Sequence, residues 1–315
     1  MYSQFFVLFA IMFTGYFFRK INLIDDAMNH GLNRFIVYFA YPCFIINGIG
    51  SLEMSTELLK QFLFSFLLYF GFFMLFAGYA YFYGKARQFP PQSSNVAEFA
   101  MVSPNNGFMG FPIALIFFGE QGLLFMLAHN AAMNFYFFSY GINLMRRNKE
   151  KEPISFRSII RSFSKMISNS NILALIIGLI LCGFHIPIPE PVGQYLTYIG
   201  SVCTPMAMIF IGSTLAGCSF LEIIRNRVVV ESSVNKLIIL PLLTLALLYF
   251  TPITPLVVAM GVLGNCFPAA ATVSMLAEQE YQDKELSSKI LFLSTIISMV
   301  TIPLTVKLIQ MIFSL

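Results

Sequence analysis

Two apolar stretches of the chain contain residue types that can unwind a helix and bind a ligand. They are 103–112, with the sequence SPNNGFMGFP, and 261–268, with the sequence GVLGNCFP. Proline removes a backbone donor, glycine permits irregular backbone, and asparagine and serine donate and accept hydrogen bonds. These types favour noncovalent binding of a small polar ligand. The predicted substrate-binding residues here are Ser103, Asn105, Asn106, Gly107, Gly110, Pro112, Gly264, Asn265 and Pro268.

A second set of polar residues lies in the apolar segment 121–145. Asn130 and Asn134 are four residues apart, so they share one face of a helix and are predicted to line the substrate path. Ionisable groups are costly inside a membrane, which makes His129 and Glu98 weaker candidates for coupling a proton or ion. Hydrogen bonding between helices is the alternative for His129 and the asparagines, and a location at the membrane interface is the favoured alternative for Glu98.

The residues that an enzyme would need are missing from the apolar segments. Aspartate occurs only at Asp25, Asp26 and Asp283, in predicted loops, and the three histidines are dispersed. Intramembrane hydrolases require paired aspartates, a Ser/His couple or a zinc site, and the five scattered cysteines have no metal-ligand spacing. We therefore expect no enzyme, no catalytic residue, no metal site and no cofactor, with Na⁺ or H⁺ as the candidate coupling ion.

The composition indicates a membrane protein, because 57% of the residues are hydrophobic, 11% are charged and the mean hydropathy is +0.76. Segments of about 20 apolar residues are long enough to cross a bilayer. The predicted fold class is an all-α polytopic membrane protein with about ten transmembrane helices, near 3–18, 31–50, 60–83, 95–118, 121–145, 170–186, 192–215, 232–251, 255–277 and 288–312.

The basic residues alternate between the loops. They follow the odd-numbered segments, most densely in the loop after the fifth, whereas the other loops contain almost none. Since cytoplasmic loops collect Lys and Arg, this predicts a multi-pass protein of the cell membrane with both termini outside. Arg34, Glu231, Lys236 and Lys307 lie near the predicted segment ends, where their charged groups are expected to reach the lipid headgroups.

An odd number of helices per half requires two similar halves to have opposite orientations. The prolines support such a division, since Pro42 and Pro112 in the first half have counterparts in Pro205 and Pro268. We predict a first five-helix repeat over 1–147, a basic cytoplasmic linker over 148–168 and a second, inverted repeat over 169–315. Helices four and nine would each break near the bilayer midplane and cross there, with Pro112 and Pro268 near the starts of the second half-helices.

The residues that carry a family resemblance are 106–112, 118–123, 268–271, 277–278, 286–288, 293–295 and 301–303. In them the chain resembles the auxin efflux carrier family in its bacterial malate/malonate-permease-like branch. The resemblance covers essentially the whole chain. It implies a fold related to the bile acid/sodium symporters, elevator-like movement of a bundle that contains the crossover, and weak organic acids carried as anions. The central loop is much shorter than the long hydrophilic loop of the plant members, which argues against a plant-type auxin exporter.

The predicted function is therefore secondary active transport of small carboxylate anions by alternating access, coupled to an ion gradient or to the membrane potential. An anion channel or a transporter-like membrane sensor is the alternative. The expected partners are a small organic acid, membrane lipids and a second copy in a homodimer, and not nucleic acid. The sequence leaves open the identity of the acid, the direction of transport, the coupling ion and the oligomeric state.

Overall fold

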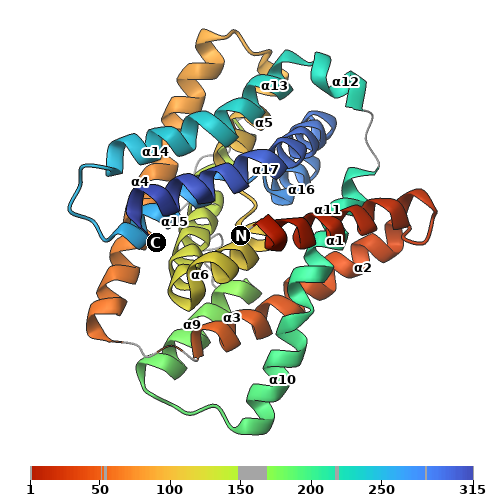
Figure 1. The fold of residues 1–315 in the computed structure, drawn as a ribbon. Helices are drawn as coiled ribbons and strands as arrows, with labels where there is room; N and C mark the ends of the chain where they lie inside the picture. The colour runs from red at the N-terminus through yellow and green to blue at the C-terminus, as the bar shows by residue number, and fades with distance from the viewer. Residues whose placement is uncertain are drawn as a thin grey trace.

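The computed structural model describes residues 2–50, 52, 55–147, 169–216, 220–280 and 282–314. Within these ranges the chain is helical and contains no β-strand (Figure 1). The predicted basic linker over 148–168 lies outside the described residues, and the described chain resumes at Asn169.

The first part of the chain forms helices within each of the first five predicted segments. Four short π-helical stretches, named η1 to η4, interrupt the α-helices within the described residues. The elements are α1 (Tyr2–Lys20), α2 (Asp26–Phe35), η1 (Ile36–Ala40), α3 (Tyr41–Gly50), α4 (Thr56–Ala86), α5 (Pro91–Val102), η2 (Asn106–Gly110), α6 (Phe111–Tyr136), η3 (Phe137–Gly141) and α7 (Ile142–Met145).

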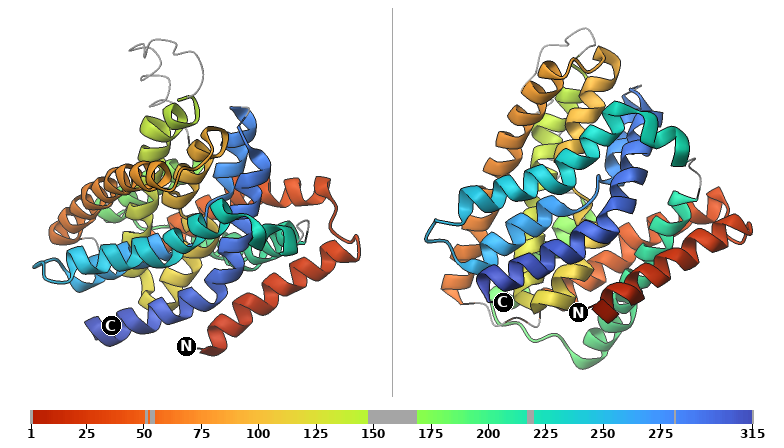
Figure 2. Two further views of the ribbon diagram at one scale, coloured as in Figure 1. Left: turned by 90° about the horizontal axis from the view of Figure 1, so that it is seen from above. Right: turned by 45° about the horizontal axis from the view of Figure 1, so that its top comes forward.

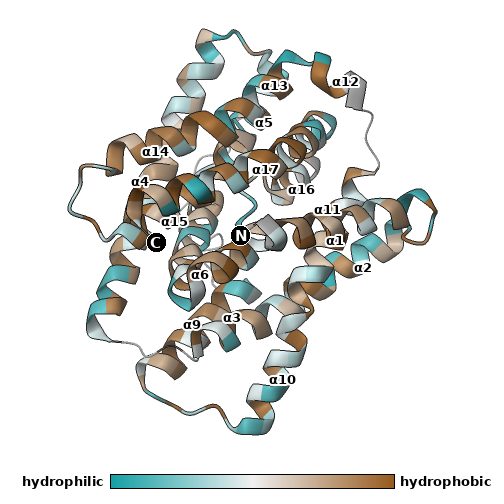
Figure 3. Cartoon of the chain, viewed as in Figure 1, coloured by the Kyte–Doolittle hydropathy of each residue, from teal (hydrophilic) through white to brown (hydrophobic). Residues whose placement is uncertain are grey.

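The second part is also helical within each predicted segment. Its elements are α9 (Ser170–Gly183), α10 (Glu190–Ser201), α11 (Cys203–Leu215), α12 (Phe220–Arg225), α13 (Arg227–Val234), η4 (Asn235–Ile239), α14 (Leu240–Leu248), α15 (Pro255–Cys266), α16 (Ala271–Gln279) and α17 (Lys284–Phe313). Six helical stretches among the described residues are long and apolar enough to cross a membrane by themselves: 26–50, 56–86, 106–145, 190–215, 227–248 and 284–313. The helices are predominantly hydrophobic along their length (Figure 3).

The stretch 106–145 is not one straight helix. Gly119 in α6 has φ 68° and ψ −164°, a conformation that side chains with a Cβ rarely adopt. The helix is therefore kinked at Gly119, between the two predicted segments 95–118 and 121–145.

The helices form two groups, and packing is closest within each group (Figures 1 and 2). The first, which we name the panel, contains α1, α2, α3, α9, α10 and α11. The second, which we name the bundle, contains α4 to α7 and α13 to α17 with their π-helical stretches. Each group draws helices from both halves of the sequence, so neither predicted repeat is a separate body.

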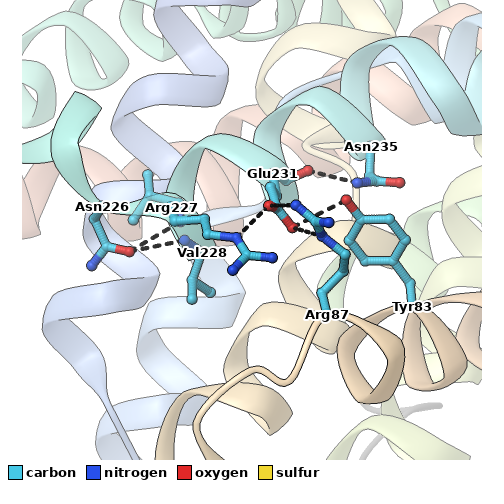
Figure 4. A network of polar contacts seen from close by, with 8 residues as sticks. Tyr83, Arg87, Asn226, Arg227, Val228, Glu231 and Asn235 are labelled. Atoms are coloured by element: carbon cyan, nitrogen blue, oxygen red, sulfur yellow. Dashed lines mark hydrogen bonds and ion pairs between the residues drawn. The ribbon is translucent and has the colours of Figure 1, made fainter.

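A network centred on Glu231 joins α4 to α13 within the bundle (Figure 4). Its carboxylate accepts hydrogen bonds from Arg87 Nε at 3.0 Å, Arg227 Nε at 2.7 Å and Tyr83 Oη at 3.1 Å. The two arginines are partly exposed, so the network lies at the surface of the bundle, near the ends of α4 and α13.

The panel depends on a close crossing of α1 and α11. A Cβ atom added at Gly212 would lie 1.8 Å from the carbonyl oxygen of Met12, and one at Gly15 would lie 2.1 Å from that of Ile209. Backbones approach this closely only where side chains are absent, as at other membrane helix crossings rich in small residues.

This geometry predicts that Gly212→Ala lowers stability by about 1–3 kcal/mol, because the new methyl group overlaps backbone atoms that must move apart. Thermal unfolding of the purified protein in detergent measures the effect. Gly71→Ala in α4 is the control, since a Cβ there meets nothing within 4 Å. Equal unfolding midpoints for the two variants would contradict the close crossing.

Candidate functional site: a cavity at the crossing of two broken helices

Two extended segments cross between α5 and η2 and between α15 and α16. The backbone N–H of Asn105 donates to the carbonyl of Pro268 at 2.8 Å, and the N–H of Ala270 donates to the carbonyl of Ser103 at 3.0 Å. Pro104 and Ala269 thus form an isolated antiparallel bridge. Each break satisfies backbone groups that the other leaves free.

The structure corrects where the breaks lie. The second half-helices begin at Asn106 and Ala271, so the first starts six residues before Pro112, whereas Pro268 lies three residues before the start of the second. Asparagine is a favoured helix N-cap, and the side chain of Asn105 accepts a hydrogen bond from the N–H of Phe108 at 3.3 Å. Pro112 lies in the first turn of α6, where proline is tolerated.

A cavity of about 500 Å³ lies beside this crossing, between the panel and the bundle. The panel contributes His30, Asn33, Arg34, Val37, Tyr38, Tyr41, Asn169 and Asn171. The bundle contributes Pro104, Asn105, Asn106, Gly107, Phe108, Asn130, Met133, Asn134, Ala270, Ala271 and Thr272.

The starts of both second half-helices line the cavity. These are Asn105–Gly107 at the start of η2 and Ala270–Thr272 at the start of α16. The first amides of a helix lack partners in their own helix, and the N-terminal end carries a partial positive charge. Two such ends at one cavity create an environment that favours an anion.

The side chain of Arg34 gives the described lining of the cavity a positive charge. Arg34 lines it, and none of the described residues that line it is an aspartate or a glutamate. The sequence analysis assigned Arg34 to the lipid headgroups, whereas the structure places it at this cavity.

Three buried polar atoms of the lining have no hydrogen-bond partner in the described part of the protein. They are Tyr41 Oη, Asn106 Oδ1 and Asn171 Oδ1. Tyr41 and Asn106 are 1% and 0% exposed. Buried polar groups are nearly always satisfied, so these atoms are available to a ligand or to water in the cavity.

His129 lies behind the cavity and holds Asn106. Its Nδ1 is 2.9 Å from Asn106 Nδ2, and its ring packs against Tyr69 and Phe73 with centroids 4.9 Å away in both cases. Gly264 makes room for this ring, since a Cβ there would lie 2.7 Å from it. His129 is absent from the cavity lining, and its contacts are those of a side chain that positions Asn106.

The remaining predicted site residues are divided between the cavity and the interior. Asn130 and Asn134 line the cavity. Asn265 does not, because α15 stays helical through Cys266 and Asn265 Nδ2 donates to Thr244 Oγ1 and to the carbonyl of Gly261, both at 3.1 Å. The others that lie outside the lining are Ser103, Gly110, Pro112, Gly264 and Pro268, of which Ser103 and Pro268 supply carbonyls to the bridge.

Glu98 forms a buried ion pair inside the bundle. Its two carboxylate oxygens accept hydrogen bonds from the two terminal nitrogens of Arg147, each at 2.9 Å, and Ser94 Oγ donates to it at 3.0 Å. The Glu98 side chain is 2% exposed. This pairing gives the carboxylate a structural role in joining α5 to the end of α7.

The sequence analysis missed the panel side of the cavity. Five residues of this side line the same cavity and recur in the sequence at positions i, i+3, i+4, i+8 and i+11: His30, Asn33, Arg34, Tyr38 and Tyr41. Such spacing marks one face of a helix, so a polar face at the start of the second predicted segment was a signal that could have indicated them.

Comparison with known proteins relates the chain as a whole to membrane transporters. A family model described as "Membrane transport protein" matches residues 1–306. An uncharacterized transporter of Methanothermobacter thermautotrophicus is 24% identical over 302 residues, which are 94% of this chain and 94% of the relative. An uncharacterized transporter of Methanocaldococcus jannaschii is 26% identical over 214 residues, which are 67% of each chain. Neither name gives a substrate.

The buried ion pair predicts that Glu98→Gln destabilises the protein by roughly 3 kcal/mol, because Arg147 loses its charged partner. Thermal unfolding in detergent measures the loss. Glu285→Gln is the control, since that side chain is 78% exposed and pairs with Lys289 at the surface, where ion pairs contribute little. If both variants unfold at the wild-type midpoint, the Glu98–Arg147 pair does not stabilise the bundle.

Proposed function

Because the chain belongs to the membrane transport protein family, which includes the auxin efflux carriers, we propose that it is a secondary carrier of small carboxylate anions that bind in the cavity at the crossing. The family match confirms the resemblance seen in the sequence and the expectation of a multi-pass membrane transporter rather than an enzyme.

The electrostatic character of the cavity is the observation that carries the proposal. Two helix N-termini and Arg34 line it, and its described lining contains no acidic side chain. A carboxylate would accept hydrogen bonds from the Arg34 guanidinium, which offers several donors in one plane, and from the unpaired hydroxyl of Tyr41. The side chains of Asn105, Asn130 and Asn134 add amide donors around it.

The size and polarity of the cavity suit a small organic acid. Its volume of about 500 Å³ falls within the usual range for small-molecule sites. Val37, Phe108 and Met133 supply apolar surface for the carbon skeleton, while the polar groups described above would orient the carboxylate.

The position of the cavity between two helix groups supports alternating access. The ligand would contact the crossing on the bundle and the polar face of α2 and α3 on the panel, so movement of the bundle against the panel would carry it across the membrane. This is the elevator-like mechanism. In it, the ten predicted segments form two inverted repeats whose broken fourth and ninth helices cross at the midplane.

The proposed topology places both termini outside and the basic loops in the cytoplasm. The two termini lie at the same edge of the molecule, opposite the end of α7 (Figure 2). Arg34 and Asn169 both lie shortly after basic loops in the sequence, so the cavity would open toward the cytoplasm. No Gly-x-x-x-x-Gly-Lys motif occurs in the sequence, so an ion gradient or the membrane potential would supply the energy.

A ligand screen tests the proposal. Purified protein in detergent is heated with dicarboxylates such as malate and malonate, with monocarboxylates and with indole acids, and a bound acid must raise the unfolding midpoint. We expect one carboxylate class to stabilise the wild type. Arg34→Gln should weaken its binding at least about tenfold, because a charge-assisted pair is lost.

The matched control for this screen is Lys20→Gln. It removes a basic residue at the end of α1 that does not line the cavity, and it should bind the same acid as the wild type does. Stabilisation by a cation or by a neutral solute alone, or equal binding by the Arg34 and Lys20 variants, would overturn the proposal.

The unpaired hydroxyl of Tyr41 gives a further prediction. Tyr41→Phe should leave stability unchanged while weakening binding of the identified acid about tenfold, since the donor serves only the ligand. Tyr136→Phe is the control, because its hydroxyl is also buried and unpaired but lies outside the cavity lining. Isothermal titration of both variants measures the difference, and equal affinities would exclude Tyr41 from the site.

A further inference from the structure

A lysine is completely buried in the bundle, behind the crossing. Lys236 lies on η4 and is 0% exposed. Its Nζ donates a hydrogen bond at 3.1 Å to the carbonyl oxygen of Val102, the last residue of α5. The expectation that Lys236 reaches the lipid headgroups is therefore wrong.

The side chain of Lys236 has no carboxylate partner among the described residues. Glu98, one turn earlier on α5, is already paired with Arg147. A buried ammonium without compensation costs several kcal/mol, so what compensates it must come from the backbone. The C-terminal end of α5 supplies this compensating negative charge, because the last carbonyls of a helix are unpaired and carry a partial negative charge.

The same place in a broken-helix carrier is suited to a metal cation. Half-helix C-terminal ends and unwound carbonyls coordinate the coupling cation in several transporter folds. We infer that the ammonium of Lys236 is a built-in cation, which occupies a monovalent-cation site at the end of α5 in place of sodium.

Further oxygen atoms lie on and beside η4, the stretch that contains Lys236. Cys266, the last residue of α15, has its Sγ 3.1 Å from Thr305 Oγ1 and 3.9 Å from the carbonyl of Leu237, the neighbour of Lys236 in the chain. Carbonyl and hydroxyl oxygens are the ligands that hard cations prefer. Removing the lysine side chain would thus leave a small space with oxygen ligands at the negative end of a helix.

This inference has a consequence for coupling that rests on the proposed function. A carrier whose cation site is filled by its own side chain binds no sodium there, so transport of the carboxylate would not require a sodium gradient. Whether the ammonium of Lys236 occupies a cation site does not depend on which substrate the cavity binds.

Thermal unfolding in NaCl, LiCl, KCl or choline chloride at constant ionic strength tests the inference. Wild-type protein should have the same midpoint in all four salts. Lys236→Ala, which vacates the site, should be stabilised by NaCl or LiCl relative to choline chloride, and the effect should saturate with concentration. Lys236→Met keeps the space filled without a charge and should respond to none of the salts.

Lys307→Ala is the matched control, because it removes an exposed lysine of α17 and should remain insensitive to the cation. If Lys236→Ala is not monodisperse after purification, Lys236→Ser replaces it in the same titration. Saturable stabilisation of the wild type by sodium would overturn the inference, and so would a folded small-residue variant with equal midpoints in NaCl and choline chloride.

The assay contains no carboxylate, which separates the two proposals. A failed ligand screen leaves the cation titration fully interpretable. Conversely, a wild type that responds to sodium would overturn the built-in cation while leaving the carboxylate cavity in place.

Discussion

Two backbone hydrogen bonds, from Asn105 to Pro268 and from Ala270 to Ser103, are the constraint on which the rest of this structure depends. Hydrocarbon offers no partner for a free amide or carbonyl, and each unsatisfied group there costs several kcal/mol. A single broken helix would therefore be unfavourable in this setting. Two breaks that cross can satisfy each other, and each of the two segments that cross here contains a proline, Pro104 in one and Pro268 in the other.

The crossing also separates the two kinds of helix end. The N-terminal ends of η2 and α16 face the cavity, where Arg34 adds a further positive charge. The C-terminal end of α5 faces the interior of the bundle, where Lys236 contacts its last carbonyl. Positive helix ends thus remain available to a ligand, whereas a negative end is neutralised by the protein itself. One pair of breaks consequently creates an anion-favouring cavity on one side and a filled cation site on the other.

The sequence predicted the helical segments well because their length and hydrophobicity are local properties. It also identified both breaks, but it could not tell which glycines unwind and which pack. Gly264 stays helical and makes room for His129, and a Cβ at Gly261 would lie 3.0 Å from the Tyr69 ring, so both permit close packing in α15. The sequence also did not predict the surroundings of two charged side chains near the segment ends. Lys236 and Arg34 lie near segment ends in the sequence, and only the packing of the bundle against the panel determines what surrounds them.

The panel and the bundle are held together by a different kind of contact from those inside each group. Aromatic rings contribute to the contact between them: Phe108 stacks on Phe210 with centroids 5.1 Å apart, and Tyr41 meets Phe108 at 5.6 Å. The bundle interior also contains the bridge at the crossing and the ion pair of the buried Glu98 with Arg147. Apolar contacts are weakly directional and can be exchanged for similar ones as surfaces slide, whereas a broken buried ion pair leaves an uncompensated charge. This difference supports the proposed movement of the bundle against the panel, along the surface where the cavity lies.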